Sequence, residues 1–165
     1  MDFTIQQVTP QDIQDKELSS LLNEVYVKGG YCTPEEAENI FAPQSVKQRG
    51  VLFSARENKT SLLAGFVIVV PFDSPASKMA KENECEMHLL GVAEAHRGNN
   101  LGNKLIQCTL GFAKESKFNK MILWTQEPMK TAQGLYERNG FEYQSTFEKN
   151  GRTFLLYEKN INTEI

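Results

Sequence analysis

The sequence has no long apolar run, no excess of positive charge and no secretory leader pattern, and each absence excludes a class of protein. Its longest apolar run, LLAGFVIVVPF at residues 62–72, is about half the length that a membrane-spanning helix requires. The net charge of -3 and the lack of a basic stripe argue against a nucleic-acid partner. The first residues, MDFTIQQVTPQD, lack the basic and then apolar order of a signal peptide. We therefore expect neither a membrane nor a nucleic acid as partner.

Cysteine is scarce, and its positions argue against disulfides and metal sites. Only Cys32, Cys85 and Cys108 occur; their spacing matches no metal-ligand motif, and any disulfide scheme leaves one of them unpaired. We therefore expect no metal cofactor and a reducing, cytoplasmic location. Cys108 falls on the apolar face of a predicted helix, so we interpret it as a packing residue.

The chain contains no repeat, linker or low-complexity segment, and its 165 residues are typical of one domain. FTIQQVT at 3–9 alternates like a half-buried strand. Thr9, followed by a proline, predicts the start of a helix that ends near KGGY at 28–31. Thr33 predicts the start of a second, short helix that Pro43 closes.

The rest of the chain alternates strands with helices. We predict a hairpin at 51–70, a polar loop at 73–83, a strand at 84–92, a helix at 100–115, a strand at 120–125, a helix that starts at Thr131 and stops at Gly140, and a final hairpin that turns at Asn150-Gly151. This mixture of hairpins and crossovers indicates an α/β (α+β) fold in which one mixed sheet carries helices on both faces.

The segment RGNNLG at 97–102 lies between the strand at 84–92 and the helix that follows it. Amides at a helix N-terminus have no partner within the helix, and the helix dipole adds partial positive charge there. Gly98 and Gly102 would let a phosphate approach the backbone, and Arg97 adds a permanent cation. These residues indicate an anion site, with a plain turn that uses glycine for its geometry as the alternative. The G-x-x-x-x-G-K-[ST] motif and a G-x-G-x-x-G after the first strand are both absent.

Two stretches, EMHLLGVAEAHRGNNLGNKLI at 86–106 and AQGLYERNGF at 132–141, together resemble motifs of the GNAT superfamily of acyl-coenzyme-A-dependent N-acyltransferases. The first is similar to its strand-loop-helix motif, which ends in R-G-x-G-[IL]-G-x-x-L. The second is similar to its helix-turn-strand motif A-x-x-L-Y-x-x-x-G-F. Two positions depart from the family pattern: Asn100 stands where the family most often has glycine, and Met129 where many members have asparagine.

The resemblance implies a single GNAT-like domain over residues 1–165, with a mostly antiparallel sheet of about six to seven strands. The strands at 84–92 and 120–125 would be parallel and splayed, which opens a cleft where acetyl-CoA, the acyl donor, meets an amine. Strand backbone would pair with the pantetheine arm, and loop amides would hold the diphosphate. The residues implied in cofactor binding are Leu90, Gly91, Val92, Arg97, Gly98, Asn99, Asn100, Leu101, Gly102 and Asn103.

Alternation along the strand at 84–92 places three ionisable side chains, Glu84, Glu86 and His88, on one face. Ionisable groups on a central strand require water or a cleft beside them. The opposite face would carry Cys85, Met87 and Leu89.

Glu86 falls where the family frequently carries its glutamate base, so it is the first candidate for the catalytic base. His88 is the second candidate, because the intrinsic pKa of histidine is close to neutral. Tyr136, in the LY pair of the second motif, is implied as the general acid toward the departing thiolate. Glu84, nearer the start of the strand, is expected at the surface.

We therefore expect an N-acetyltransferase that moves the acetyl group of acetyl-CoA to a primary amine of a small molecule or peptide, by direct transfer in a ternary complex. The segments at 28–33 and 73–83 are expected to line the acceptor side. Acidic groups in the cleft would favour a cationic amine, such as a polyamine or a lysine side chain. The alternatives are a non-catalytic acyl-CoA-binding regulatory module and a different ligand-binding protein in which RGNNLG is only a turn. The sequence is compatible with a monomer or a homodimer.

Overall fold

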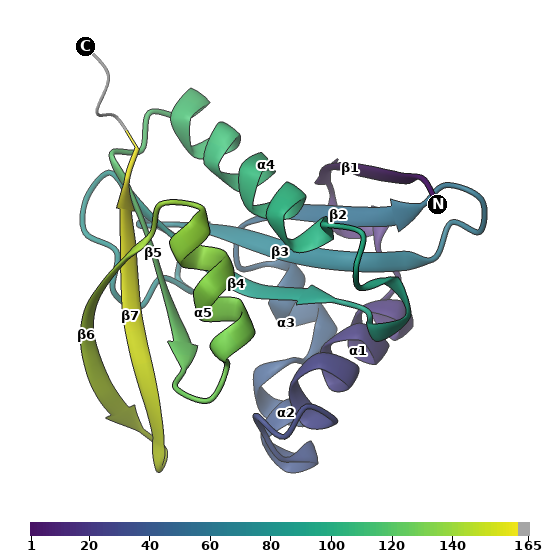
Figure 1. The fold of residues 1–165 in the computed structure, drawn as a ribbon, viewed down its shortest axis with the longest axis horizontal. Coiled ribbons are helices and arrows are strands. Elements are labelled where there is room, and N and C mark those ends of the chain that lie inside the picture. The colour runs from purple at the N-terminus through teal and green to yellow at the C-terminus, as the bar shows by residue number, and fades with distance from the viewer. Residues whose placement is uncertain (162–165) are drawn as a thin grey trace.

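A seven-stranded sheet in the order β1-β2-β3-β4-β5-β7-β6 runs through the computed structural model, which describes residues 1–161 (Figure 1). Every neighbouring pair of strands is antiparallel except β4 and β5, which are parallel. The predicted mixed, mostly antiparallel sheet is therefore confirmed. The strands are β1 (Phe3–Val8), β2 (Val51–Glu57), β3 (Leu63–Pro71), β4 (Glu84–Val92), β5 (Lys120–Gln126), β6 (Glu142–Lys149) and β7 (Arg152–Asn160).

Helices cover both faces of the sheet, as the sequence predicts (Figure 1). One face packs against α4 (Leu101–Glu115) and α5 (Lys130–Arg138), and Cys108 lies against this side of the core. The other face packs against α1 (Asp15–Leu22), α2 (Pro34–Ile40) and α3 (Pro43–Lys47). No helix within residues 1–161 is long and apolar enough to cross a membrane.

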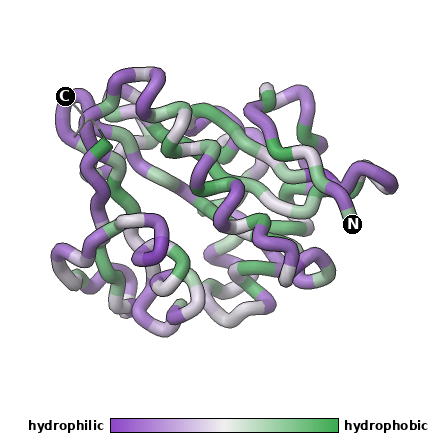
Figure 2. Tube along the Cα trace, turned by 45° about the horizontal axis from the view of Figure 1, so that its top comes forward, coloured by the Kyte–Doolittle hydropathy of each residue, from purple (hydrophilic) through white to green (hydrophobic). Residues whose placement is uncertain are grey.

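The central strand β3 has a continuous apolar sequence because both of its faces are buried. Val67 and Val69 lie in the core under α4, whereas Phe66 and Ile68 lie in the core over α1. A strand that is covered on both sides needs no polar alternation. Figure 2 shows the resulting pattern: apolar segments run through the sheet, and hydrophilic segments lie mostly at the outer turns.

The N-terminal helices begin later than predicted. Thr9 starts only a short 3-10 turn over Pro10–Asp12, and extended backbone at the buried Ile13 separates this turn from α1. A new start at Gln14 begins α1, with the backbone amide of Gln14 donating to the Glu17 carboxylate at 2.9 Å. Burial of Ile13 requires the extended step, and periodicity alone does not reveal it.

Later boundaries follow local turn chemistry more closely. Thr33 caps the start of α2, as predicted. Pro43, expected to close this helix, lies after its end and is the first residue of α3. The cap of α5 is Met129 instead of Thr131. The final hairpin turns at Asn150 and Gly151, both with positive φ, as predicted.

A bulge in β4 changes which side chains face which helix layer. Leu89 has a φ of 58°, and the pairing with β3 shifts between Ile68, opposite His88, and Phe66, opposite Gly91. Leu89 therefore packs with the α1 side of the core, and Leu90 packs with the α4 side. The expectation that Leu89 shares a face with Cys85 and Met87 is wrong for this reason.

The strands β4 and β5 pair only at one end. Their parallel ladder joins Glu84–Glu86 with Lys120–Ile122, and the two strands turn apart beyond it (Figure 1). The predicted splay is confirmed, and it leaves the β5-facing edge of the second half of β4 without a strand partner.

Candidate active site

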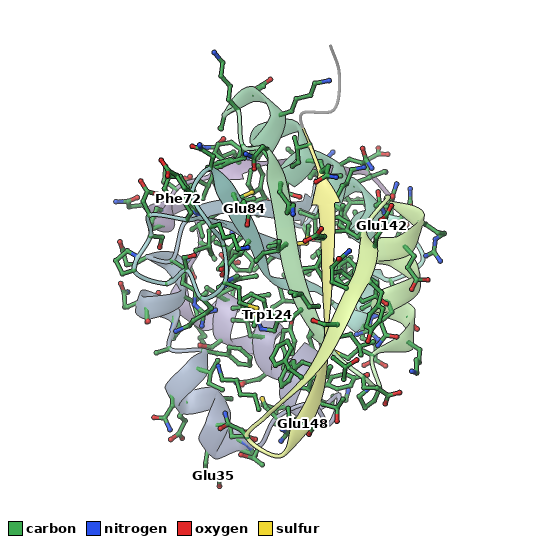
Figure 3. All side chains as sticks on the ribbon, turned by 90° about the vertical axis from the view of Figure 1, so that its left-hand side faces the viewer. Glu35, Phe72, Glu84, Trp124, Glu142 and Glu148 are labelled. Carbon is green, nitrogen blue, oxygen red and sulfur yellow. The ribbon has the colours of Figure 1, made fainter. Side chains whose placement is uncertain are left out.

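A cavity of about 730 Å³ opens where β4 and β5 separate. It is lined by residues from both strands, from the π-helical segment after α1 and the turn that follows it, from α2 and α3, from the loop at 75–78 and from the β6–β7 hairpin. Figure 3 faces the hairpin side: Trp124 of β5 lies in the middle of the view, below the Glu84 end of the strand pair. Two contacts join the β5–β7 side of the cavity to the N-terminal helices and the segment between them. They are an ion pair of Arg152 with Glu36 at 2.7 Å and a hydrogen bond from Gln126 to the Tyr31 carbonyl at 2.7 Å.

Glu86 is completely buried and lies behind this cavity, outside its lining. Its Oε2 accepts hydrogen bonds from the Ser77 hydroxyl at 3.1 Å and from the amides of Lys78, Met79 and Ala80 at 2.8, 2.6 and 2.8 Å. Burial by itself raises the pKa of this carboxyl, but hydrogen bonds from His88 and from these amides outweigh burial and hold the pKa at about 2. The Glu86 carboxylate is thus ionised and accepts five hydrogen bonds.

His88 lies between Glu86 and the cavity. Its Nε2 is 2.8 Å from Oε1 of Glu86, and its Nδ1 is 3.2 Å from Nη1 of Arg49. A carboxylate only accepts and a guanidinium only donates, so Nε2 carries the proton and Nδ1 has the lone pair. Burial lowers the pKa of His88, and the Arg49 charge lowers it further, partly opposed by Glu86. The ring packs edge-on against Trp124, with centroids 5.2 Å apart.

The third ionisable residue of this strand face, Glu84, does not reach the cavity. It stands at the start of β4, half-buried, and its carboxylate accepts from the amide of Lys81 at 3.0 Å. The structure therefore brings Glu86 and His88 together and leaves Glu84 apart, near the loop at 73–83.

Two tyrosines enter the cavity from opposite layers. Tyr136, on α5, is buried and lines the cavity, and burial raises the pKa of its hydroxyl. Tyr26, in the π-helical segment Asn23–Val27 that continues α1, donates a hydrogen bond to the Leu90 carbonyl at 3.0 Å. Nothing in the sequence marks Tyr26 or Arg49 as site residues. An aromatic at helical spacing from Leu22 is typical of a core residue, and a lone arginine before a strand carries no motif.

The loop that precedes α4 presents free backbone amides. The amides of Gly98 through Asn103 donate no hydrogen bond within residues 1–161, whereas Arg97 and Lys104 on either side donate to Glu94 and Asn100. Gly98 has a φ of 86°, and a Cβ built there would meet no atom within 4 Å. Six consecutive donors at a helix N-terminus form a cradle suited to an anion.

Gly102, which the sequence predicts in the anion site, also lies where two helices meet. A Cβ at this position would lie 2.9 Å from Cδ2 of Leu135, so the glycine lets α4 approach α5. Of the two glycines, Gly98 has a positive φ and Gly102 does not.

The segment at 16–141 matches the model of a family described as Acetyltransferase (GNAT) family. The chain belongs to this family. It is 28% identical over 105 residues to the human (Homo sapiens) N-acetyltransferase 8B, an alignment that covers 64% of this chain and 42% of that protein. It is 27% identical over 109 residues to human N-acetyltransferase 8, covering 66% and 44%. The matched region thus spans less than half the length of these relatives.

Solved structures agree with this assignment at the level of the fold. A GNAT-family acetyltransferase from Staphylococcus aureus Mu50 superposes with a TM-score of 0.75 at 17% identity, covering 98% of this chain and 100% of that one. An IAA acetyltransferase from Bacillus cereus ATCC 14579 superposes with a TM-score of 0.67 at 18% identity, covering 96% and 99%. Both neighbours share the GNAT architecture described above.

The two departures from the GNAT motifs lie at helix starts. Asn100 precedes α4 with a φ of 60° and a ψ of 25°, so it adopts the left-handed conformation that a glycine would adopt there. Met129 precedes α5 and lines the cavity, and its sulfur lies 3.6 Å from the Thr125 hydroxyl. Asn100 therefore preserves the loop geometry, and Met129 replaces a polar side chain with a soft apolar one.

The charge of the cavity differs from the acidic site that the sequence predicted, because Glu86 lies behind the wall. The charged residues in the lining are Arg49, Lys78, Lys149, Arg152 and Glu36. Glu36 is the one carboxylate among them, and it is paired with Arg152. No group of three His, Cys, Asp or Glu side chains within the described residues could hold a metal ion.

Proposed function

We propose that this GNAT chain is an N-acetyltransferase that transfers the acetyl group of acetyl-CoA directly to a primary amine within a ternary complex. The observation that carries the proposal is that β4 leads from the cavity to the loop with free amides. Leu90 of β4 lines the cavity where the two strands separate, and the amides of Gly98–Asn103 follow shortly after the strand ends. Such a path suits a molecule with a diphosphate at one end and a reactive thioester at the other.

The residues present fit this donor. The amides of Gly98 to Asn103, with the Arg97 cation beside them, would hold the diphosphate, and the unpaired edge at Leu90, Gly91 and Val92 would hold the pantetheine arm. Tyr26 donates to only one of the two lone pairs of the Leu90 carbonyl, so a second donor has room to bind there. Acetyl-CoA supplies an activated thioester carbonyl.

His88 is the group best suited to remove the proton from the amine. A primary amine with a pKa near ~10.4 is protonated at pH 7, and its deprotonation costs about 4–5 kcal/mol. Nδ1 of His88, which lines the cavity, has a lone pair that accepts from Arg49 and becomes available to the amine when Arg49 releases it, whereas Glu86 accepts five hydrogen bonds behind the cavity and has a pKa of about 2. We therefore assign His88 as the base and Glu86 as the residue that orients it, which reverses the order that the resemblance implies.

Tyr136→Phe should lower kcat about 100-fold and leave the affinity for coenzyme A nearly unchanged. A buried tyrosine hydroxyl with a raised pKa keeps its proton and can donate it to a departing thiolate. The measurement is release of free thiol at saturating acetyl-CoA, with Tyr143→Phe on the exposed edge strand as a control. An unchanged kcat in the Tyr136 variant would show that this hydroxyl does not donate a proton to the thiolate.

Gly98→Ala should weaken coenzyme A binding about 10-fold, because a side chain at a positive φ costs roughly 1–2 kcal/mol when the loop takes its binding conformation. Calorimetry with coenzyme A measures this loss. Gly111→Ala is the matched control, since Gly111 lies within α4 with open space around it and no positive φ. Equal affinities for the two variants would argue against a cradle at Gly98.

The proposed function is tested by combining calorimetry with an amine panel. We expect coenzyme A to bind and at least one primary amine to release thiol from acetyl-CoA. Coenzyme A binding without thiol release from any amine would favour the non-catalytic acyl-CoA-binding module. No binding at high micromolar coenzyme A would contradict both.

A further inference from the structure

Arg49 is a half-buried cation with no carboxylate partner within residues 1–161. Its Nη2 donates to the Ile40 carbonyl at 2.8 Å and its Nη1 to His88 at 3.2 Å, which leaves three of its five N–H groups without a protein acceptor. The other half-buried arginines are paired: Arg56 with Glu17 at 2.6 Å and Arg152 with Glu36 at 2.7 Å. An unpaired charge is costly to bury, so Arg49 is suited to receive an anion.

The rest of the cavity favours an anionic ligand over a polycation. Arg49, Lys78, Lys149 and Arg152 line it, and Glu36 is the single carboxylate in the lining. Oε1 of Glu36 already accepts from Arg152 and from the Thr33 amide. A second ammonium group on the acceptor would thus find mostly cations, beside a single carboxylate that is already paired with Arg152.

The contact between Arg49 and His88 limits the shape of the acceptor. The guanidinium that would bind the anion and the imidazole that would take the amine proton are 3.2 Å apart. An amine and an anion that engage adjacent groups must be close neighbours in the acceptor. A carboxylate on the carbon that carries the amine meets this condition, and its planar geometry matches the donor fork of arginine.

Aromatic side chains fill much of the remaining wall. Trp124 packs against His88, and the ring centroids of Tyr26 and Phe41 lie 5.1 Å apart. The aromatic residues Trp124, Tyr26, Phe41 and Phe154 all line the cavity. Aromatic walls bury apolar groups well. A side group on the acceptor would therefore be apolar.

We infer that the amine acceptor is an α-amino acid with a free carboxylate and an apolar side chain, and that Arg49 binds the carboxylate. This inference rests on the proposed acetyl transfer. His88 takes one proton from the ammonium form and passes it to solvent; the amine nitrogen then bonds to the carbonyl carbon, the C–S bond breaks, and the second proton leaves the nitrogen for His88. The sulfur takes up one proton, so N-acetyl amino acid, free coenzyme A and one net proton are formed.

The test compares leucine, methionine and phenylalanine with their carboxamides and with the amines that lack the carboxyl carbon, scored by thiol release from acetyl-CoA. We expect kcat/KM for the amino acids to exceed that for the neutral analogues at least 100-fold. In Arg49→Gln this ratio should fall below 10-fold, while Arg49→Lys keeps part of it because the charge remains. Arg138→Gln, an exposed arginine on α5, is the control that should leave the ratio unchanged.

Calorimetry with coenzyme A accompanies each variant, and retained affinity establishes that the Arg49 variants are folded. Equal rates on amino acids and their carboxamides, or a preference for diamines, would overturn the inference and leave the acetyltransferase standing. Thiol release from none of these acceptors and from no amine of the broader panel would overturn the proposed function, and the inference with it.

Discussion

We expect His88→Gln to lower kcat for acetyl transfer by roughly 100- to 10,000-fold, the range typical of general acid–base catalysis. Glutamine retains a donor for Glu86 but has no basic lone pair to replace Nδ1. The same substitution at His96, the other histidine of the chain, is the matched control, because His96 packs against Phe3 instead of lining the cavity. Similar losses in both variants would contradict a catalytic role for His88.

The pH dependence of kcat follows from the same residue. Burial and the Arg49 charge lower the pKa of His88. The acid limb of the kcat–pH profile therefore lies below the usual histidine pKa of about 6.5. At neutral pH, Nδ1 is already unprotonated. We expect kcat to be level near pH 7 and to fall only at more acidic pH, and a limb above pH 7 would be inconsistent with this environment.

Glu86→Gln should lower kcat on the order of 10³-fold, by a similar amount across neutral and alkaline pH. The loop amides at 78–80 and the Ser77 hydroxyl would hold the glutamine carbonyl, which turns its NH₂ group toward His88. His88 would then take the opposite tautomer, with a proton on Nδ1 facing the donor Arg49.

The alternative role of Glu86 makes a different prediction. If Glu86 were the base, the loss in the glutamine variant would shrink as pH rises, because the amine deprotonates without help. A pH profile of kcat for the wild type and the variant distinguishes the two roles. Recovery of kcat in the glutamine variant at high pH would assign the role of base to Glu86.

Glu86 also links stability to pH. Its pKa is about 2 in the folded protein, against an ordinary value of 4.5, so its stabilising contribution is complete above pH 4.5 and is lost as pH falls toward 2. The difference in free energy of unfolding between the wild type and Glu86→Gln should therefore be largest at neutral pH and smaller at pH 3. Urea denaturation at both pH values measures it, and a constant difference would contradict the ionised, hydrogen-bonded carboxylate.

Local patterns in the sequence predict most of the fold and the loop of the site. The apolar spacing of α4, the turn at Asn150-Gly151 and the order of strands follow from periodicity and turn chemistry, which act over a few residues. The cradle follows as well, since free amides are a property of any helix start.

The chemistry of the cavity depends on long-range packing that such patterns do not contain. Arg49 reaches His88 from 39 positions away, and Tyr26 reaches Leu90 from 64 positions away. The bulge at Leu89 moves one side chain to the other face, although nothing in its residue type favours a positive φ. The loop amides that hold Glu86 lie in a segment whose sequence predicts only irregular structure.

The most direct test of the account is an NMR titration that follows the backbone amides of Gly98 through Asn103 as coenzyme A is added, with pantetheine, which lacks the diphosphate, as the comparison. We predict that these six amides shift with coenzyme A, at the affinity found by calorimetry, and stay unchanged with pantetheine. If coenzyme A binds while these amides remain unshifted, the cradle does not hold the diphosphate and the account is contradicted.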